Sequence, residues 1–347
     1  MSFCRLRRQT DLNLNLADDV DTGVFRRPGE LPTSCMITGK YLYVRKSMAR
    51  STYVFDRWVP REKSTWAFRV FKKHTSELLR MYTAFDNARG HTYSNLGKTA
   101  SWSDPPDRHF KFPHRLLRQD QFSDLKEWSN TFNDLANWVN LNALVAISSN
   151  LETYLATVIP LAVASDVGVL HGVPRRIDGI AILKHGRANA FNFEQYAVAC
   201  TKDDWSKRLA AYERLFGRSP KFFSSNIASL ERIRRIRNNV AHAFGRDIEA
   251  SRNQMEVKTV PIEKLSVESL LQLQRVVWQL VKAIDVHLQF HIGEYQALAF
   301  YHGIYPELRK DLHLSMRAME LKTRIGEFGS RAGKEFCKGL VQYYEGL

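Results

Sequence analysis

Residues 227–244, IASLERIRRIRNNVAHAF, decide the fold. Five apolar side chains recur there at intervals of three and four residues, the period of an amphipathic helix: Leu230, Ile233, Ile236, Val240 and Phe244. At about 100° per residue they share one face, which we expect to be buried. The helix would begin near Ser224 or Ser225 and end before Gly245. Arg234 and Asn238 would then lie on its open side.

Helical periodicity continues on both sides of this stretch. Four further segments have it: residues 65–87, 122–160, 203–216 and 267–292. Ser123 can cap the start of the second of these segments, and Gly217 follows the third. Residues 294–347 predict one or two more helices. Residues 166–200 contain several Gly and Pro residues, which favours a loop with one short element. The pattern predicts a mainly α protein.

Composition narrows the class of protein and of partner. The chain has 347 residues, of which 44% are hydrophobic, enough for a sizeable core. Its net charge of +15 favours a polyanionic partner, with nucleic acid ahead of an anionic membrane. The four cysteines form no C-x-x-C pair, so neither zinc nor a disulfide framework is expected. We expect no signal peptide, because residues 1–15 contain no apolar run, and no membrane span, because the apolar run 155–164 is short. A cytoplasmic protein is the expectation.

The first 120 residues differ from the rest. They hold 22 Lys and Arg against 12 Asp and Glu. Residues 40–45 and 51–56 alternate with period two, as strands do. We therefore expect three parts. These are a basic, aromatic N-terminal region of irregular α+β structure, a helical domain and a C-terminal helical extension, at residues 1–121, 122–292 and 293–347.

Aromatic and basic residues interleave within the N-terminal region. Exposed rings beside cations suit single-stranded RNA, since bases stack on the rings and phosphates pair with the cations. Aromatic side chains are also common in protein cores, which is the competing interpretation. The residues that this hypothesis assigns to RNA binding are Arg45, Lys46, Arg57, Trp58 and Arg61.

A candidate catalytic motif closes the helix at 227–244. Residues 237–242, RNNVAH, place a His five positions after an Arg, with an Asn directly after the Arg. The spacing alone is weak evidence, because Arg69 precedes His74 by the same five positions and Arg108 precedes His114 by six. An apolar residue follows Arg69, and a proline adjoins His114, so we favour the pair at 237 and 242.

The motif resembles that of the HEPN superfamily, in which four to six residues, usually beginning with a polar one, separate an Arg from a His. The neighbouring helices are similar as well: Leu151-Glu152-x-x-Leu155, Trp205-x-x-Arg208-Leu209 and Leu230-x-x-Ile233-x-x-Ile236-Arg-Asn. The resemblance covers residues 122–292 and implies a HEPN-like helical bundle. It also implies a homodimer with a composite active site, and RNA cleavage without metal or cofactor.

These residue types suit cleavage of RNA by its own 2′-OH. Such a reaction needs proton transfer, which His242 can supply at neutral pH, and positive charge on the phosphate, which Arg237 can supply. The products would be a 2′,3′-cyclic phosphate and a 5′-OH, and DNA would stay intact. Asn238 would orient His242 or hold phosphate, or simply end the helix. Two supporting candidates are Glu152, which would pair with an Arg of the motif helix, and Arg234, which would bind phosphate. The competing interpretation of both is a solvated charge.

Three functions remain open at this point. The first is a ribonuclease that acts as a toxin or anti-phage effector on tRNA or other RNA, held in check by an antitoxin or a sensor. The second is a catalytically silent HEPN module for dimerisation and RNA binding. The third is an unrelated basic regulator, which the lack of a helix-turn-helix, zinc or RRM signature disfavours.

Overall fold

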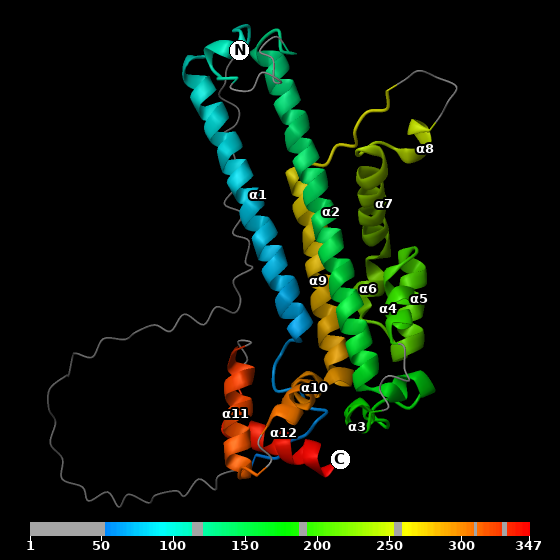
Figure 1. Ribbon diagram of the computed structural model, residues 1–347. Helices are drawn as coiled ribbons and strands as arrows, with labels where there is room; N and C mark the ends of the chain where they lie inside the picture. The colour runs from blue at the N-terminus through cyan, green and yellow to red at the C-terminus, as the bar shows by residue number, and fades with distance from the viewer. Residues whose placement is uncertain (1–52, 113–120, 187–192, 253–258, 309–310, 328–331) are drawn as a thin grey trace, which may run out of the picture. The chain divides into compact units, whose positions relative to one another are not determined.

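The computed structural model describes residues 53–112, 121–186, 193–252, 259–308, 311–327 and 332–347. In these residues the chain is helical with no strand, apart from an isolated bridge between Asp166 and Asp178, so the expected mainly α class is confirmed. The elements, labelled in part in Figure 1, are α1 (Trp66–Thr99), η1 (Pro106–Arg108), α2 (Leu125–Ser165), η3 (Val167–His171), α3 (Gly179–Lys184), α4 (Glu194–Thr201), α5 (Trp205–Phe216), α6 (Lys221–Ser225), α7 (Ile227–Ala243), α8 (Ile248–Ser251), α9 (Val267–Ile292), α10 (Tyr295–Ile304), η5 (Tyr305–Glu307), α11 (Leu314–Glu327) and α12 (Lys334–Gly346).

Helix α2 packs against several of the other helices. It contacts α1, α4, α7 and α9, and α1 runs antiparallel beside it (Figure 1). Leu144, Leu151, Leu155 and Val158 are at most 1% exposed, so this part of α2 is core. Burying side chains of this size stabilises a fold by about 1.5–3 kcal/mol each. The position of α2 therefore fixes where side chains on its remaining face can point.

Both ends of α2 differ slightly from the predicted helix. Asp124, one residue after the expected cap Ser123, accepts the backbone N–H of Glu127, and the Glu127 carboxylate accepts the N–H of Ser123 in return. At the other end the helix continues through Pro160 to Ser165. Proline removes one hydrogen bond, but Val158, Ile159, Ala162 and Val163 around it are fully buried and hold the helix in place.

By length and composition alone, α2 is long and apolar enough to cross a membrane. One 18-residue window of it has a mean hydropathy of 1.3, and 44% of that window is buried inside the fold. A core helix of a globular protein has the same properties. The contacts of α2 with four other helices agree with a core helix.

The N-terminal part of the chain contains a longer helix than predicted. The helix expected at 65–87 is confirmed, and α1 extends it to Thr99. The strand expected at 51–56 is wrong where the structure describes it, because residues 53–56 form no strand. Residues 40–45 lie outside the described residues. The boundary expected at residue 121 stays a prediction, although contacts between α1 and α2 cross it.

Two segments hold more helix than their sequences predicted. The expected loop at 166–200 contains α3, α4 and η3, and the tail after residue 293 contains α10, α11 and α12. Gly179 suggested a loop, but it has another purpose. A Cβ there would lie 1.6 Å from the carbonyl oxygen of Ala164, so only glycine lets α3 approach the backbone of α2.

A hydrogen bond between aromatic side chains ties α5 to α9. The Tyr212 hydroxyl and His287 Nδ1 lie 2.7 Å apart, and Tyr212 is fully buried. Burial, together with the nearby His291 and Arg218, lowers the pKa of His287 from 6.5 to about 4. The imidazole is therefore neutral in the folded protein at neutral pH.

This shift predicts a pH-dependent loss of stability. Below pH 6.5 the unfolded chain binds a proton at His287 and the folded chain does not, until the pH falls to about 4. We expect this residue to remove up to about 3 kcal/mol of unfolding free energy between these pH values. Urea denaturation at pH 7, 6, 5 and 4 should show a smaller loss in His287→Gln. Equal losses in both proteins would contradict the assignment.

Candidate functional site

Helix α7 carries the RNNVAH motif and ends differently from the prediction. Leu230, Ile233 and Ile236 are at most 1% exposed, as expected for the core face. Phe244 is 53% exposed, so its predicted core position is wrong. The helix stops at Ala243, and Phe244 takes a left-handed conformation with φ of 54°, which turns its ring out toward Trp138.

Arg237 is held by its neighbours at the surface of the fold. Its Nη2 lies 2.8 Å from Glu152 Oε2, and its Nη1 donates to Asn238 Oδ1 at 2.9 Å. The Arg237 side chain is 32% exposed. The suggested pairing of Glu152 with an Arg of the motif helix is confirmed. Asn238 contacts Arg237 through its side-chain oxygen, so it orients the guanidinium of the motif.

A second arginine, Arg208 of α5, shares the same carboxylate. Arg208 Nη2 lies 3.6 Å from Glu152 Oε1, and Arg208 Nε donates to the backbone oxygen of Asp203 at 3.0 Å. The residue is 4% exposed, and its guanidinium lies over the ring of Trp205. Burial lowers the pKa of Arg208, while Glu152 opposes that shift. Its Nη1 is buried without a hydrogen-bond partner among the described residues.

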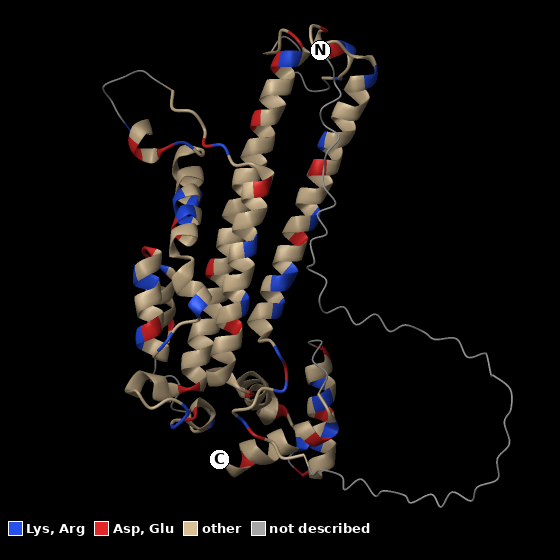
Figure 2. Cartoon of the chain, turned by 180° about the vertical axis from the view of Figure 1, so that it is seen from behind, with Lys and Arg blue, Asp and Glu red and all other residues tan. Residues whose placement is uncertain are grey.

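The arginines line an open pocket between α2, α4, α5 and α7. Its volume is about 480 Å³, and its charged and amide residues are Glu152, Lys202, Asp203, Arg208, Arg234, Arg237 and Asn238. Arg234 also bonds to Glu231, which raises the pKa of Arg234. Four cations face two carboxylates in the pocket lining, so its charge favours an anion. In Figure 2 the arginines of α7 form a blue band beside α2.

His242 is exposed but does not line this pocket. It lies five residues after Arg237, which on a helix is about 7.5 Å along the axis and about 140° round it. The structure therefore brings Glu152, Arg234, Arg237 and Asn238 together and leaves His242 on a different side of α7. A single chain does not join the Arg and the His over one group.

The N-terminal RNA-binding hypothesis gains little from the described residues. Arg45 and Lys46 lie outside them. Arg57 is 1% exposed and its guanidinium bonds to Asp178 and to the backbone oxygens of Ser165 and Ile292, so its assignment to RNA binding is wrong. An internal anchor of this kind satisfies buried carbonyl groups.

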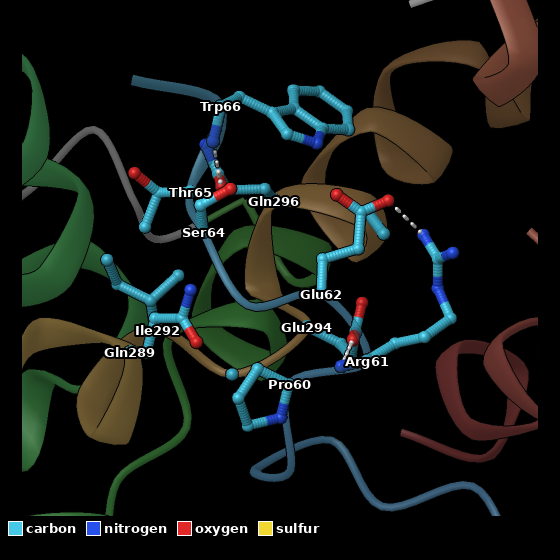
Figure 3. A pocket seen from close by; sticks show the side chains of 12 residues that line it. Pro60, Arg61, Glu62, Ser64, Thr65, Trp66, Gln289, Ile292, Glu294 and Gln296 are labelled. Atoms are coloured by element: carbon cyan, nitrogen blue, oxygen red, sulfur yellow. Dashed lines mark hydrogen bonds and ion pairs between the residues drawn. The ribbon is translucent and has the colours of Figure 1, made fainter. Parts of the chain in front are cut away.

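Trp58 and Arg61 also contact other side chains within the fold. The guanidinium of Arg57 lies 3.7 Å from the centre of the Trp58 ring, and the guanidinium of Arg61 pairs with Glu62 and lies over Phe336. Figure 3 shows the cavity beside them, where the Arg61 backbone N–H donates to Glu294. Its volume of about 30 Å³ is too small for a nucleotide.

Sequence reasoning missed Arg208 and Lys202. The pattern contained one signal for Arg208. It lies three residues after Trp205 and four before Tyr212, so it occupies the apolar stripe of its helix. A charge at such a position needs a buried partner, which the Glu152 carboxylate provides. Nothing local marks Lys202, because its place in the pocket depends on how α4 packs on α2.

Neither the arrangement of possible metal ligands nor the comparison with known proteins selects one of the candidate functions. Among the described residues, no three His, Cys, Asp or Glu side chains gather as a metal-ligand set. Comparison with protein-family models, with curated proteins and with solved structures gave no match. Any assignment to a family therefore depends on the motif and the order of the helices.

The shared carboxylate predicts an effect on stability. Glu152→Ala would leave the buried Arg208 without its counter-ion, so we expect the free energy of unfolding to fall by about 2 kcal/mol. Asp134→Ala, at an exposed position of the same helix, should change it by less than about 0.5 kcal/mol. Urea denaturation measures both. Equal small effects would show that Glu152 is a solvated charge.

Proposed function

We propose that this protein is a metal-independent RNA endonuclease of the HEPN type, with Arg237 and His242 as its catalytic residues. The observation that carries the proposal is the setting of Arg237. Its guanidinium is oriented by Glu152 and Asn238 at the edge of an open cationic pocket, and an exposed imidazole follows on the same helix. A guanidinium that only stabilised the fold would need neither the pocket nor the imidazole.

The chemistry follows from the two groups. Neutral His242 accepts the proton of an RNA 2′-OH, whose oxygen attacks the adjacent phosphorus. Arg237 binds the phosphate oxygens as negative charge accumulates on them. The 5′-oxygen leaves and takes a proton from the imidazolium, which restores the neutral histidine. The products are a 2′,3′-cyclic phosphate and a 5′-OH, and DNA has no 2′-OH to react.

A homodimer supplies the geometry that one chain lacks. Arg237 and His242 point to different sides of α7, whereas two copies related by a two-fold axis can place the Arg of one beside the His of the other. The biological role that fits is a toxin or anti-phage effector that cuts tRNA or other RNA in the cytoplasm. Such an enzyme would need an antitoxin or a sensor as a second partner.

Cleavage of RNA by the purified protein tests the proposal. We expect cleavage of total RNA in EDTA, none of DNA, and a loss of at least about 100-fold in His242→Ala and in Arg237→Ala. His74→Ala is the matched control, because the exposed His74 also follows an arginine by five residues and should be dispensable.

Two outcomes would overturn the proposal. Cleavage by His242→Ala at the wild-type rate would assign the chemistry to other residues. Binding of RNA without any cleavage by the wild-type protein would favour the alternative, a catalytically silent dimerisation and RNA-binding scaffold.

Mixing two inactive variants tests the composite site. In a heterodimer of Arg237→Ala with His242→Ala, one site would regain both groups and the other would lose both. Equal co-expression should then restore about a quarter of the wild-type rate, since about half of the dimers are mixed. No recovery in a preparation that contains heterodimers would place both groups of each site on one chain.

A further inference from the structure

Arg208 is unusual because it is almost fully buried and incompletely bonded. It is 4% exposed, yet its Nη1 has no hydrogen-bond partner among the described residues. A charged donor left in this state is unfavourable, since buried polar groups normally have partners. Arg208 also lines the open pocket beside Arg237. An anion in that pocket would supply an acceptor for the Nη1 donor, in addition to the counter-ion Glu152.

Two more cations extend the pocket away from Arg237. Arg234 lies one turn before Arg237 on α7, and Lys202 follows the last residue of α4. Lys202 is exposed, and the Arg234 side chain is 33% exposed, so both can reach a ligand from solvent. With Arg208 they come from three different elements. Convergence of cations from separate helices is the arrangement that phosphate-binding sites use.

Glu152 acts as the internal counter-ion of this pocket. It accepts from Arg237 at 2.8 Å, and its other oxygen lies 3.6 Å from Arg208. A carboxylate between two guanidinium groups keeps both charges stable while no ligand is bound. It also competes with an incoming anion for the same donors. Removal of its charge should therefore strengthen the binding of an anion.

We propose that this pocket is a phosphate-binding subsite, in which Lys202, Arg208 and Arg234 hold a phosphate group adjacent to the one that Arg237 contacts. The proposal deepens the proposed ribonuclease function and rests on it for the identity of the ligand as a backbone phosphate of RNA. The volume of about 480 Å³ exceeds that of one phosphate group, so the open pocket has room for a phosphate and its adjoining nucleotide. Phosphate oxygens match the forked donors of arginine.

Binding of an uncleavable oligonucleotide provides the first measurement. A fluorescein-labelled 2′-O-methyl oligonucleotide lacks the attacking hydroxyl, so its anisotropy reports binding alone. We expect Arg234→Gln and Lys202→Gln each to weaken binding about fivefold to tenfold. Each should also reduce the slope of log K against log salt by about 0.7, the value for one phosphate contact on a single strand. Glu152→Gln should bind several-fold more tightly than wild type.

Controls separate the subsite from general charge and from folding. Arg235→Gln removes the same charge from an exposed position of α7 outside the pocket and should leave the slope unchanged. Arg208→Lys keeps the buried charge and loses the forked donors, so it should weaken binding while the protein stays folded. Thermal unfolding of each variant checks that it is folded.

Inorganic phosphate distinguishes the two sources of the ligand. If a backbone phosphate occupies the pocket, the variants lose oligonucleotide affinity as described. If the pocket serves free phosphate, millimolar inorganic phosphate should raise the unfolding temperature of wild type but not of Arg234→Gln or Lys202→Gln, with oligonucleotide affinity unchanged. Either result supports a phosphate site. The proposal is overturned if the variants keep wild-type oligonucleotide affinity and inorganic phosphate leaves the unfolding temperature of wild type unchanged.

The subsite and the nuclease can fail independently. If the wild-type protein cuts no RNA but Arg234→Gln binds the oligonucleotide more weakly than wild type, the nuclease is refuted and the subsite stands. If cleavage depends on His242, while the Arg234 and Lys202 variants bind the oligonucleotide as wild type does and inorganic phosphate does not stabilise the protein, the subsite is refuted and the nuclease stands.

Discussion

The carboxylate of Glu152 is the contact on which the arrangement of the site depends. It comes from the central helix α2 and holds Arg237 of α7 and Arg208 of α5. Two helices that carry positive charge would otherwise repel each other at this point, and a buried guanidinium would lack a counter-ion. Because α2 is fixed by its apolar residues, the position of Glu152 is fixed as well. The geometry of the pocket therefore follows from the packing of the core.

Much of the fold could be predicted from the sequence, because apolar periodicity reports which helix faces are buried. It predicted α9 from Val267 to Ile292 and α5 with its stop at Gly217. It was wrong at Phe244, because periodicity assumes that a helix continues and contains no information on where the backbone turns left-handed. Gly179, the first residue of α3, was misinterpreted for a similar reason, since close helix packing and a flexible loop need the same residue.

The site was predictable in part. The motif, its Asn and the pairing with Glu152 follow from patterns within and between neighbouring helices. The pocket does not, since it needs Lys202 and Arg208 from elements whose approach to α7 depends on the tertiary fold. The failure at Arg57 is instructive as well. Its basic, aromatic surroundings indicated a nucleic-acid surface, whereas the guanidinium saturates buried carbonyl groups. Composition does not distinguish these two uses of an arginine.

The anchor at Arg57 has a consequence for the order of events during synthesis. Its guanidinium bonds to Ser165 and Ile292, which lie 108 and 235 residues further along the chain. A ribosome that adds about 5–20 residues per second needs roughly 10–50 s to make the longer of these intervals. The guanidinium of Arg57 therefore lacks its last partner until Ile292 has been made, although Ser165 has been available since about the middle of that interval. This anchor is therefore completed after translation has passed the end of α9, where it joins two segments that are far apart in the sequence.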